Sequence, residues 1–526
     1  MPEILYLLDG HALAYRTYYA LTKGGTASSR WLTSSGEPTA GIYGFTSVLL
    51  RILEQENPDY IAVAFDTGKT FRHELYKGYK ATRAKMPEDL RPQVERMRQV
   101  VDAFNIPRLE VQNYEADDVL GSLACWAAQQ KGLGVKIITG DKDLLQLVTN
   151  RIVVSLPTHT LSDSEDYFPE DVKHKLGVMP DQVVDYKALI GDKSDNIPGV
   201  RGIGVKTATA LLTKYKTLNN IYQHLDEITG RTHTALEASH TEAYLSQELA
   251  QIVTNLDIKL DLEHARANRF DPHLVENLFR ELEFRTLMPR LNKVIKKLRP
   301  ESLQGQQMAL FRNTSAPVET TQSPEQIKPT LVDTPESLLA CVKALSGASQ
   351  IAFDTETTST DPMRAKLVGI SLAVQEDQGY YIPVGHKEGR QLPLKQVLAA
   401  LRNPLTNPKI AKIAHNAKYD YLVLSRFGLD VTPITFDSMI AEWLINPASH
   451  NLSLKNLAWV RLGYEMTKID ALIGSGRKQI TMNLVPIIQA AAYAVADAVI
   501  TLRLVVPLKN DLEKMSAIKL FEEIEM

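Results

Sequence analysis

Residues 114–121 read YEADDVLG and place three carboxylates immediately before an apolar run. Glu115 and Asp118 are three residues apart, and Asp117 lies beside them. Residues three or four apart share one face of a helix, so a helix beginning here would gather negative charge at its start. Carboxylates crowded in this way repel one another unless cations neutralise them. The stretch therefore indicates either an acidic helix cap or one wall of a metal site.

Short apolar runs surround this stretch. They lie at 4–8 (ILYLL), 60–65 (YIAVAF), 135–139 (VKIIT) and 151–156 (RIVVSL), and amphipathic segments alternate with them. This alternation predicts a largely parallel sheet covered by helices. After Ile197 the sequence becomes helical. We therefore expect an α/β domain that is followed by helices.

Acidic residues follow three of these predicted strands, in LLDG, AFD and ITGDKD. Ligands of open α/β sheets collect beyond the carboxyl ends of the strands, so these side chains are expected to converge on one crevice. A cap role explains any single Asp, but it explains the whole set poorly. Together with the acids of YEADDVLG and GDKSD, the pool contains Asp9, Asp66, Glu115, Asp117, Asp118, Asp141, Asp143, Asp192 and Asp195. Hard oxygen ligands without a His/Cys cluster predict Mg²⁺ or Mn²⁺ in a two-metal phosphoryl-transfer site and disfavour Zn²⁺.

Two basic features flank the acidic pool. Between residues 69 and 98, nine Lys or Arg residues stand against four acids and are interleaved with aromatic residues. Cations with aromatic rings suit single-stranded nucleic acid, although a solvated basic helix face has the same pattern. The second feature, IPGVRGIGVKTA at 197–208, is a Gly-rich turn that opens a helix, with N–H groups and Lys206 available for a phosphate.

These blocks resemble, in order and spacing, the 5′ nuclease domain of bacterial DNA polymerase I, which is related to flap endonucleases. They are LLDGHALAYRTYYAL, FDTGKTFRHELYKGYKATR, YEADDVLG, TGDKDLLQLV and ALIGDKSDNIPGVRGIGVKTA. The resemblance implies a PIN/flap-endonuclease-like parallel-sheet domain with a helical arch at 1–175, followed by a helix-hairpin-helix DNA-binding part at 176–295.

The resemblance also implies roles for individual residues. All the acids of the pool would bind the two metal ions. The arch, which would clamp or thread a 5′ flap, would contain Arg72, Tyr79, Lys80 and Arg83. Arg16 would lie near the scissile phosphate and act in catalysis with Lys80 and Arg72. The helix-hairpin-helix, with a K⁺ ion, would grip duplex backbone through Gly199, Gly202, Gly204 and Lys206.

A second α/β unit is expected after a linker. Residues 296–330 are rich in Gln, Ser, Thr and Pro toward their C-terminal end, which is linker composition. Apolar runs follow at 351–355, 367–374 and 380–384. The last two runs are close enough to pair as antiparallel neighbours.

This unit carries a second set of acids. In IAFDTETT, Asp354 and Glu356 are two apart on a predicted strand and point to the same side. Asp420 in HNAKYD is expected early in a helix, and Tyr493 and Asp497 are four apart on a helical face. Each piece alone is common, but the three in order are specific. They predict an all-oxygen site with two metal ions, in which Tyr493 and Glu356 orient the attacking water.

The three pieces resemble the motifs of DEDDy proofreading exonucleases, and the surrounding text resembles the 3′ to 5′ exonuclease domain of the same polymerase family. The resemblance covers 331–515 and implies an RNase H-like fold. The metal ligands that it implies are Asp354, Glu356, Asp420 and Asp497. The sequence departs from many members at Thr358 and Thr360, where an acid and an apolar wedge would hold the terminal base.

Residues 516–526 resemble the lead-in to the polymerase domain of the family, whose palm, fingers and thumb motifs do not occur in the sequence. The chain as given is therefore not expected to extend a primer. Two alternatives explain the absence of these motifs: the sequence is a fragment of a longer polymerase, or it is a natural two-nuclease protein.

Composition narrows the setting. The formal net charge is −3, so any basic surface for nucleic acid must be local. Cys125 and Cys341 lie far apart, which argues against a disulfide framework and favours a reducing compartment. The sequence contains no run of about 18 apolar residues, so no membrane span is predicted. We expect a cytoplasmic, nucleoid-associated bacterial protein.

The leading hypothesis is a monomeric enzyme of DNA replication and repair with two metal-dependent phosphodiesterase sites. Its partners would be DNA with 5′ flaps, nicks or gaps, 3′ single-stranded ends, and RNA primers. The rival hypothesis is a non-catalytic DNA-binding scaffold whose acids are structural.

Overall fold

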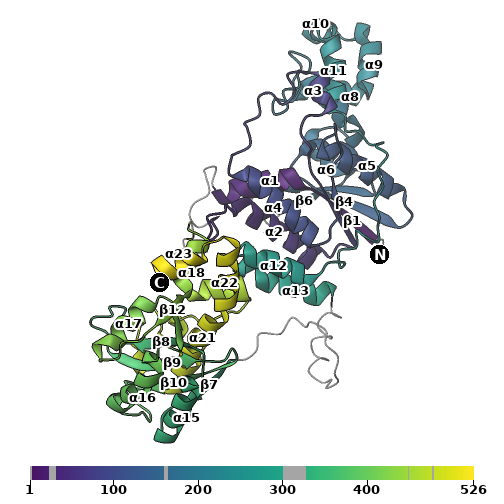
Figure 1. Ribbon diagram of the computed structural model, residues 1–526. Helices are drawn as coiled ribbons and strands as arrows, with labels where there is room; N and C mark the ends of the chain where they lie inside the picture. Colours follow the sequence, from purple (N-terminus) through teal and green to yellow (C-terminus); the bar gives the residue numbers. More distant parts are fainter. Residues whose placement is uncertain are drawn as a thin grey trace. The chain divides into compact units, whose positions relative to one another are not determined.

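The computed structural model of the protein contains two compact units, each of which is described by itself (Figure 1). The elements before 300–326 form the first unit, and those after it form the second. The structure describes residues 3–22, 31–158, 164–299, 327–447, 449, 451–476 and 479–526.

A sheet with strand order β3-β2-β1-β4-β5-β6 forms the centre of the first unit. Its strands are β1 (Glu3–Asp9), β2 (Tyr60–Ala64), β3 (Arg108–Leu109), β4 (Leu133–Ile138), β5 (Ile152–Pro157) and β6 (Ser164–Tyr167). All neighbours pair in parallel except β5 and β6, which are antiparallel. The predicted parallel sheet is confirmed, whereas the edge strands β3 and β6 were not predicted.

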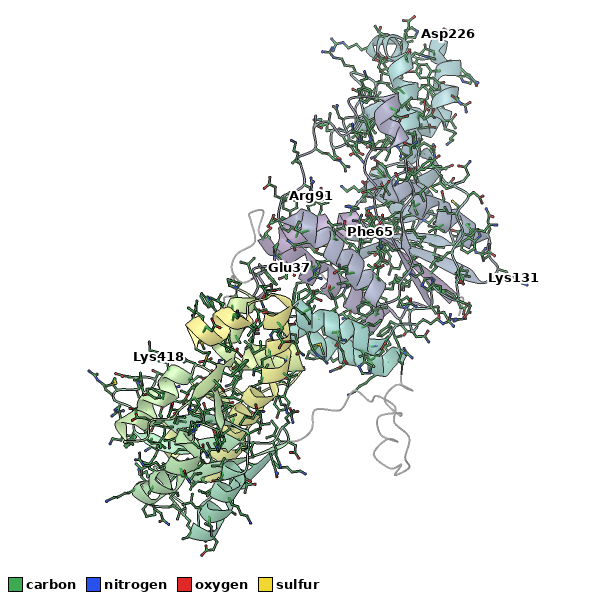
Figure 2. The ribbon with its side chains drawn as sticks, in the orientation of Figure 1. Glu37, Phe65, Arg91, Lys131, Asp226 and Lys418 are labelled. Carbon is green, nitrogen blue, oxygen red and sulfur yellow. The ribbon has the colours of Figure 1, made fainter. Side chains whose placement is uncertain are left out.

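Both faces of this sheet are buried. Along β1, Leu5 and Leu7 belong to one core, and Tyr6 and Leu8 belong to the other, as the two-residue period of a strand requires. This explains why the strand is a continuous apolar run. Phe65 lies inside the unit, and Figure 2 shows it among the surrounding elements. The covering helices include α1 (Gly10–Thr22), α2 (Ala40–Arg51), α4 (Leu90–Ala103) and α5 (Ala116–Gln129).

Only helices follow Ile197 among the described elements of the first unit, as predicted, and further helices precede it. They are α3 (Phe71–Leu75), α6 (Pro169–Leu176), α7 (Val183–Ile190), α8 (Val205–Tyr215), α9 (Leu218–Gln223), α10 (Gly230–Ala238), α11 (His240–Ala250), α12 (Pro272–Glu281) and α13 (Met288–Leu298).

A tight turn connects α7 to α8. Asp192 and Ile197 exchange backbone hydrogen bonds of 3.0 and 2.8 Å across it. Gly199 has a φ of +65°, and a Cβ at this position would lie 2.3 Å from the backbone nitrogen of Gly191. The close approach requires glycine at Gly199, and it holds GDKSD beside the Gly-rich turn.

The second unit is built on a mixed sheet with strand order β12-β11-β8-β9-β10-β7. β8 pairs in parallel with β11 and antiparallel with β9, and β9 and β10 are antiparallel neighbours, as predicted. The fold class, α/β in both units, is therefore confirmed. The strands are β7 (Lys328–Leu331), β8 (Gln350–Thr357), β9 (Leu367–Ala373), β10 (Gln378–Pro383), β11 (Ala411–Ala414) and β12 (Ile434–Asp437).

Helices cover both faces of this second sheet. α15 and α16 belong to one core, and α21 belongs to the other, where it packs across β8, β9 and β10. The helices are α15 (Pro335–Ser346), α16 (Leu394–Thr406), α17 (Ala417–Arg426), α18 (Ser438–Ile445), α19 (Leu454–Leu462), α20 (Asp470–Ile473), α21 (Ile487–Arg503), α22 (Val505–Lys514) and α23 (Ile518–Leu520).

The stretch Ile487–Lys514 is long and apolar enough to cross a membrane, but 67% of its most apolar window is buried inside the protein. Because α21 packs on the sheet, the apolar composition of this stretch is explained by a core helix.

Two predicted boundaries differ from the structural ones. β7 begins at Lys328, so the last residues assigned to the linker at 296–330 pair with β10 instead. Most of that linker, 300–326, lies outside the described residues. At the C-terminal end, Phe521 is fully buried in the same core as α21. Residues 516–526, expected to begin a further domain, therefore pack within the second unit.

Gly199→Ala is expected to destabilise the first unit by at least about 1–2 kcal/mol, because alanine is strained in the left-handed region and its Cβ would clash with Gly191. Gly134→Ala in β4 is the matched control, because its φ is not positive and the nearest atom to a Cβ built there is 3.9 Å away. Urea unfolding measures both changes. Equal stability of the two variants would contradict the assignment of a glycine requirement to Gly199.

Candidate functional site

The first unit brings the strand-end acids to one edge of its sheet. Asp9 is the last residue of β1, while Asp66 follows β2 and Asp141 follows β4. β1 pairs in parallel with both neighbours, so the three carboxyl ends share this edge. Asp9 accepts hydrogen bonds from the Ala12 N–H and the Thr139 hydroxyl, both at 2.9 Å. This is the arrangement that the sequence predicted.

The helix that begins in YEADDVLG is α5, and Glu115 is its N-cap residue. The Glu115 N–H donates to Asp118 Oδ2 at 3.0 Å, and the Ala116 N–H donates to Asp66 Oδ1 at 2.8 Å. Unpaired N–H groups and the helix dipole stabilise carboxylates at a helix N-terminus. The helix itself therefore satisfies part of the crowded negative charge.

Asp118 is fully buried and forms a bidentate ion pair with Arg72, which is itself 2% exposed. Nη1 and Nη2 of Arg72 donate to the two carboxylate oxygens at 2.7 and 2.8 Å. Arg72 also donates to the carbonyls of Leu249 and Gln251, and the Val253 N–H donates to Asp118. The pair ties α3 and α5 to the segment around the end of α11. The predicted roles, a metal ligand for Asp118 and a catalytic group for Arg72, stay predictions.

Other residues of the basic segment also face the acids. Lys80 Nζ donates to Glu115 Oε1 at 2.7 Å, and the Tyr79 hydroxyl donates to Glu115 Oε2 at 3.0 Å. Arg83 forms an ion pair with Asp195. The Tyr79 ring is 4% exposed, so a base cannot stack on it in this conformation. These three side chains neutralise acids here, and their predicted contacts with DNA stay predictions.

Lys187 of α7 is a further partner of these acids, which was not predicted from the sequence. Its Nζ donates to Asp192 Oδ2 at 2.7 Å and forms an ion pair with Asp143. In the sequence, Lys187 is only a lysine shortly before GDKSD. An exposed lysine on a helix would look the same, so the sequence does not reveal this partner.

Four acids of the pool have no lysine or arginine at ion-pair distance among the residues that the structure describes: Asp9, Asp66, Asp117 and Asp141. Burial, reinforced by the charge of Asp66, raises the pKa of Asp9 to about 7. Burial and the charges of Asp141 and Asp9 hold the pKa of Asp117 well above its usual range. A divalent cation would relieve this cost, and the all-carboxylate donor set fits Mg²⁺ or Mn²⁺.

A cleft of about 950 Å³ opens beside the acids. Asp141 lines it together with Arg16 and Arg83, and Tyr15 and Tyr19 in its wall stack with ring centroids 6.4 Å apart. Cations and aromatic rings beside a group of carboxylates suit a nucleic-acid strand.

The Gly-rich turn presents backbone at the start of α8. Gly202 has a φ of +97°, and Gly204, the N-cap residue, is exposed, as is Lys206. The Gly199 N–H is engaged, because it donates to Ser246 Oγ at 2.9 Å. The unpaired N–H groups of the first turn of α8 suit a phosphate. The predicted contacts of these glycines with DNA stay predictions.

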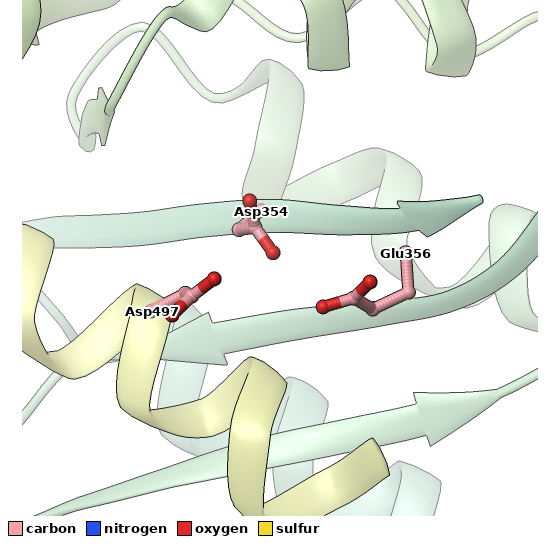
Figure 3. Close-up of side chains that lie close together, drawn as sticks. All are labelled: Asp354, Glu356 and Asp497. Atoms are coloured by element: carbon pink, nitrogen blue, oxygen red, sulfur yellow. The ribbon is translucent and has the colours of Figure 1, made fainter. Parts of the chain in front are cut away.

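The second unit gathers its carboxylates more tightly. One oxygen each of Asp354, Glu356 and Asp497 lies within 4.8 Å of the others. Figure 3 shows these carboxylates, two from β8 and one from α21, pointing toward one another. Oδ1 of Asp497 is buried and has no hydrogen-bond partner. Burial raises the pKa of Asp354 to about 6 and that of Glu356 well above its usual range. An orphaned oxygen in an all-oxygen group fits a divalent cation.

The fourth acid of this group is Asp420 in α17, which is 3% exposed. The N–H and the hydroxyl of Thr355 donate to its Oδ1 at 2.9 and 2.5 Å. Burial and the charge of Asp354 raise its pKa well above the usual range. Thr355 therefore holds Asp420 next to the other acids.

Tyr493 lies one helical turn before Asp497 on α21, as predicted. Burial, the charges of Asp497 and Glu356, and a hydrogen bond with Asp497 raise the pKa of its hydroxyl far above the usual value, so the hydroxyl stays protonated. Lys455 of α19 donates to the same hydroxyl at 3.1 Å. Lys455 was not among the residues predicted from the sequence.

The chain matches three family models in succession. Residues 4–177 match the 5′-3′ exonuclease, N-terminal resolvase-like domain; 178–273 match the 5′-3′ exonuclease, C-terminal SAM fold; and 329–513 match the 3′-5′ exonuclease.

Curated relatives include DNA polymerase I of Chloroflexus aurantiacus, which is 42% identical over 99% of this chain and 56% of its own length. DNA polymerase I of Synechocystis sp. is 34% identical over 99% of this chain and 57% of its own length. The chain thus spans little more than half the length of these relatives. Among solved structures, a zinc-bound T5 5′-exonuclease aligns with a TM-score of 0.38 and 22% identity over 54% of this chain and 99% of its own.

Without divalent cations, the stability of the protein is expected to fall as the pH rises from about 4 to 7. The raised pKa values of Asp9 (about 7) and Asp354 (about 6) mean that the folded state holds more protons than the unfolded state in this range. Thermal unfolding in EDTA at several pH values measures the slope. Mn²⁺ should flatten it, and so should Asp9→Asn. The same slope with and without Mn²⁺ would contradict a metal-binding role of these acids.

Arg72→Met is expected to destabilise the first unit by about 3–5 kcal/mol, because it leaves the Asp118 carboxylate buried without its partner. The matched control is Arg83→Met, whose side chain is 44% exposed and whose ion pair is expected to contribute about 1 kcal/mol or less. Urea unfolding compares them. A loss for Arg72→Met no larger than that of the control would contradict a structural role of the buried pair.

Proposed function

The chain belongs to the bacterial DNA polymerase I family, of which it carries the 5′-3′ and 3′-5′ exonuclease regions, and we propose that each region is an active metal-dependent nuclease. The observation that carries this proposal is common to both units. Each holds buried or half-buried carboxylates without a lysine or arginine at ion-pair distance, among the described residues, at one place in its fold. Such groups are costly unless cations bind them.

We propose two Mg²⁺ or Mn²⁺ ions at each site. Bound there, the ions would activate water and neutralise charge on the phosphate that is cleaved. In the first unit, the four acids without a lysine or arginine partner are the first candidates for ligands, and the remaining acids of the pool would complete the set. In the second unit the ligands would be Asp354, Glu356, Asp420 and Asp497. A K⁺ ion is proposed at the Gly-rich turn.

In the first unit, the chain's own residues would bind and orient a DNA strand. Arg16 lines the cleft beside Asp141, which supports a contact with the scissile phosphate. Lys80 and Arg83 would exchange Glu115 and Asp195 for phosphate oxygens when DNA enters. We propose substrates with 5′ flaps, nicks or gaps, and RNA primers, because the basic segment and the Gly-rich turn suit single-stranded and duplex backbone respectively.

In the second unit, Glu356 and the protonated Tyr493 are proposed to orient the attacking water at a 3′ single-stranded end. The Thr358 hydroxyl accepts the Lys366 N–H at 3.0 Å and Thr360 is exposed. Neither offers an apolar surface, so we propose that the terminal base is held less firmly than in relatives with an apolar wedge there.

The proposed setting is the bacterial cytoplasm and nucleoid, where the protein would act on DNA as a monomer in replication and repair. The second candidate function is a non-catalytic DNA-binding scaffold. The protein cations that already neutralise five acids of the first pool favour it, because those acids have partners without metal.

Asp117→Asn is expected to lower the rate of 5′ cleavage, and Asp354→Ala the rate of 3′ cleavage, each by about 100-fold or more. The reason is that each substitution removes a proposed metal ligand worth several kcal/mol of transition-state stabilisation. Asp117→Asn should abolish cleavage of a 5′ flap and spare a frayed 3′ end, and Asp354→Ala should do the reverse. Gel assays with Mg²⁺ on both substrates measure the effects, with Asp226→Asn, an exposed aspartate, as the control.

Two outcomes would contradict the proposal. Full activity of both variants would leave the acids structural, as in the scaffold hypothesis. Loss of both polarities through either single substitution would argue against two independent sites.

A further inference from the structure

Lys455 contacts Tyr493, the tyrosine of the proposed site in the second unit. Its Nζ donates to the Tyr493 hydroxyl at 3.1 Å and lies 4.8 Å from the centroid of the tyrosine ring. The two residues come from α19 and α21, which pack against each other. Lys455 therefore reaches the site from a helix that supplies none of its carboxylates.

The position of Lys455 is electrostatically unfavourable for a lysine that only folds the protein. It is the second residue of α19, where the positive end of the helix dipole repels a cation. Burial lowers its pKa, and the charges of Asp497 and Glu356 oppose that shift. The acids of the site offset part of the cost of this placement, so the lysine and the acids depend on one another.

The contact fixes the direction of the tyrosine proton. A lysine ammonium only donates hydrogen bonds, so the Tyr493 oxygen must accept from Lys455. Its own proton is then turned away from Lys455, toward the acids with which the hydroxyl also interacts. Without Lys455, the hydroxyl could rotate and accept from water instead.

The charge balance favours the same assignment. Two divalent cations would neutralise the four carboxylates of this site. A phosphodiester brings one negative charge, and more develops as water attacks. A preorganised cation such as Lys455, held beside the site by its contact with Tyr493, would stabilise that charge.

We propose that Lys455 is a positioning residue of the 3′-5′ exonuclease, which holds the Tyr493 hydroxyl as a donor toward the reacting water and balances the charge of the bound phosphate. The inference rests on the proposed function of the second unit.

The test compares Lys455→Met and Lys455→Arg with Lys395→Met in the full chain. Lys395 is an exposed lysine at the second position of α16, so it matches Lys455 in residue type and in place on its helix. Lys455→Met should lower kcat on a frayed 3′ end by roughly 10- to 100-fold and change KM by less than about threefold. Lys455→Arg should restore most of kcat. Lys395→Met should leave both constants unchanged.

Mn²⁺ titration by electron paramagnetic resonance gives a readout other than activity, performed on Asp117→Asn protein to weaken the first site. Removing a positive charge beside the acids should strengthen Mn²⁺ binding in Lys455→Met by roughly two- to tenfold. A residue that only holds the fold would weaken Mn²⁺ binding and thermal stability together, and that result would overturn the inference.

Failure of the inference differs from failure of the proposed function. If the unsubstituted chain degrades the 3′ end and Lys455→Met does so at the same rate, the inference alone falls. If the unsubstituted chain leaves the 3′ end intact with Mg²⁺ and Mn²⁺, the proposed function falls, and the inference falls with it.

Discussion

Repulsion between carboxylates is the constraint on which both sites depend. Two unit charges 4 Å apart interact by about 4 kcal/mol at an effective dielectric constant of 20. Asp354, Glu356 and Asp497 approach one another within 4.8 Å, and none of them has a lysine or arginine at ion-pair distance in the described part of the chain. Burial raises the pKa of Asp354, and burial together with the charges of neighbouring carboxylates raises those of Glu356 and Asp497. The fold holds these acids in place through α21 and β8, so protons or bound cations must supply the missing charge.

The first unit meets the same constraint in a different way. Lys80, Arg83 and Lys187 come from two segments far apart in sequence and neutralise acids around the cleft. Lys80 and Arg83 belong to the basic segment, whose charges would also suit phosphates. The acids and a DNA strand therefore compete for the same cations. Metal binding at the acids would release these side chains, and this couples the metal site to the strand physically.

The sequence predicted what depends on local pattern. The run at 4–8 was predicted correctly as a strand, because both faces of β1 are buried and its sequence is therefore continuously apolar. β6 (SEDY) was missed, because a polar edge strand has no such pattern. The strand-end acids were found because topology places them at one edge. Their partners were not, because the Arg72–Asp118 pair joins residues 46 positions apart and depends on tertiary packing.

The three acids of YEADDVLG lie at one helix start, but each has different surroundings. Successive residues of a helix point about 100° apart, so neighbours meet different surroundings. Glu115 caps α5 and receives Lys80. Asp118 turns inward to Arg72 and is satisfied by the fold. Asp117 has neither partner, and its pKa is raised by burial and by the acids of neighbouring strand ends. Of the three, Asp117 is the carboxylate that the proposed metal ion would neutralise, while Glu115 and Asp118 hold the helix start in place through their own partners.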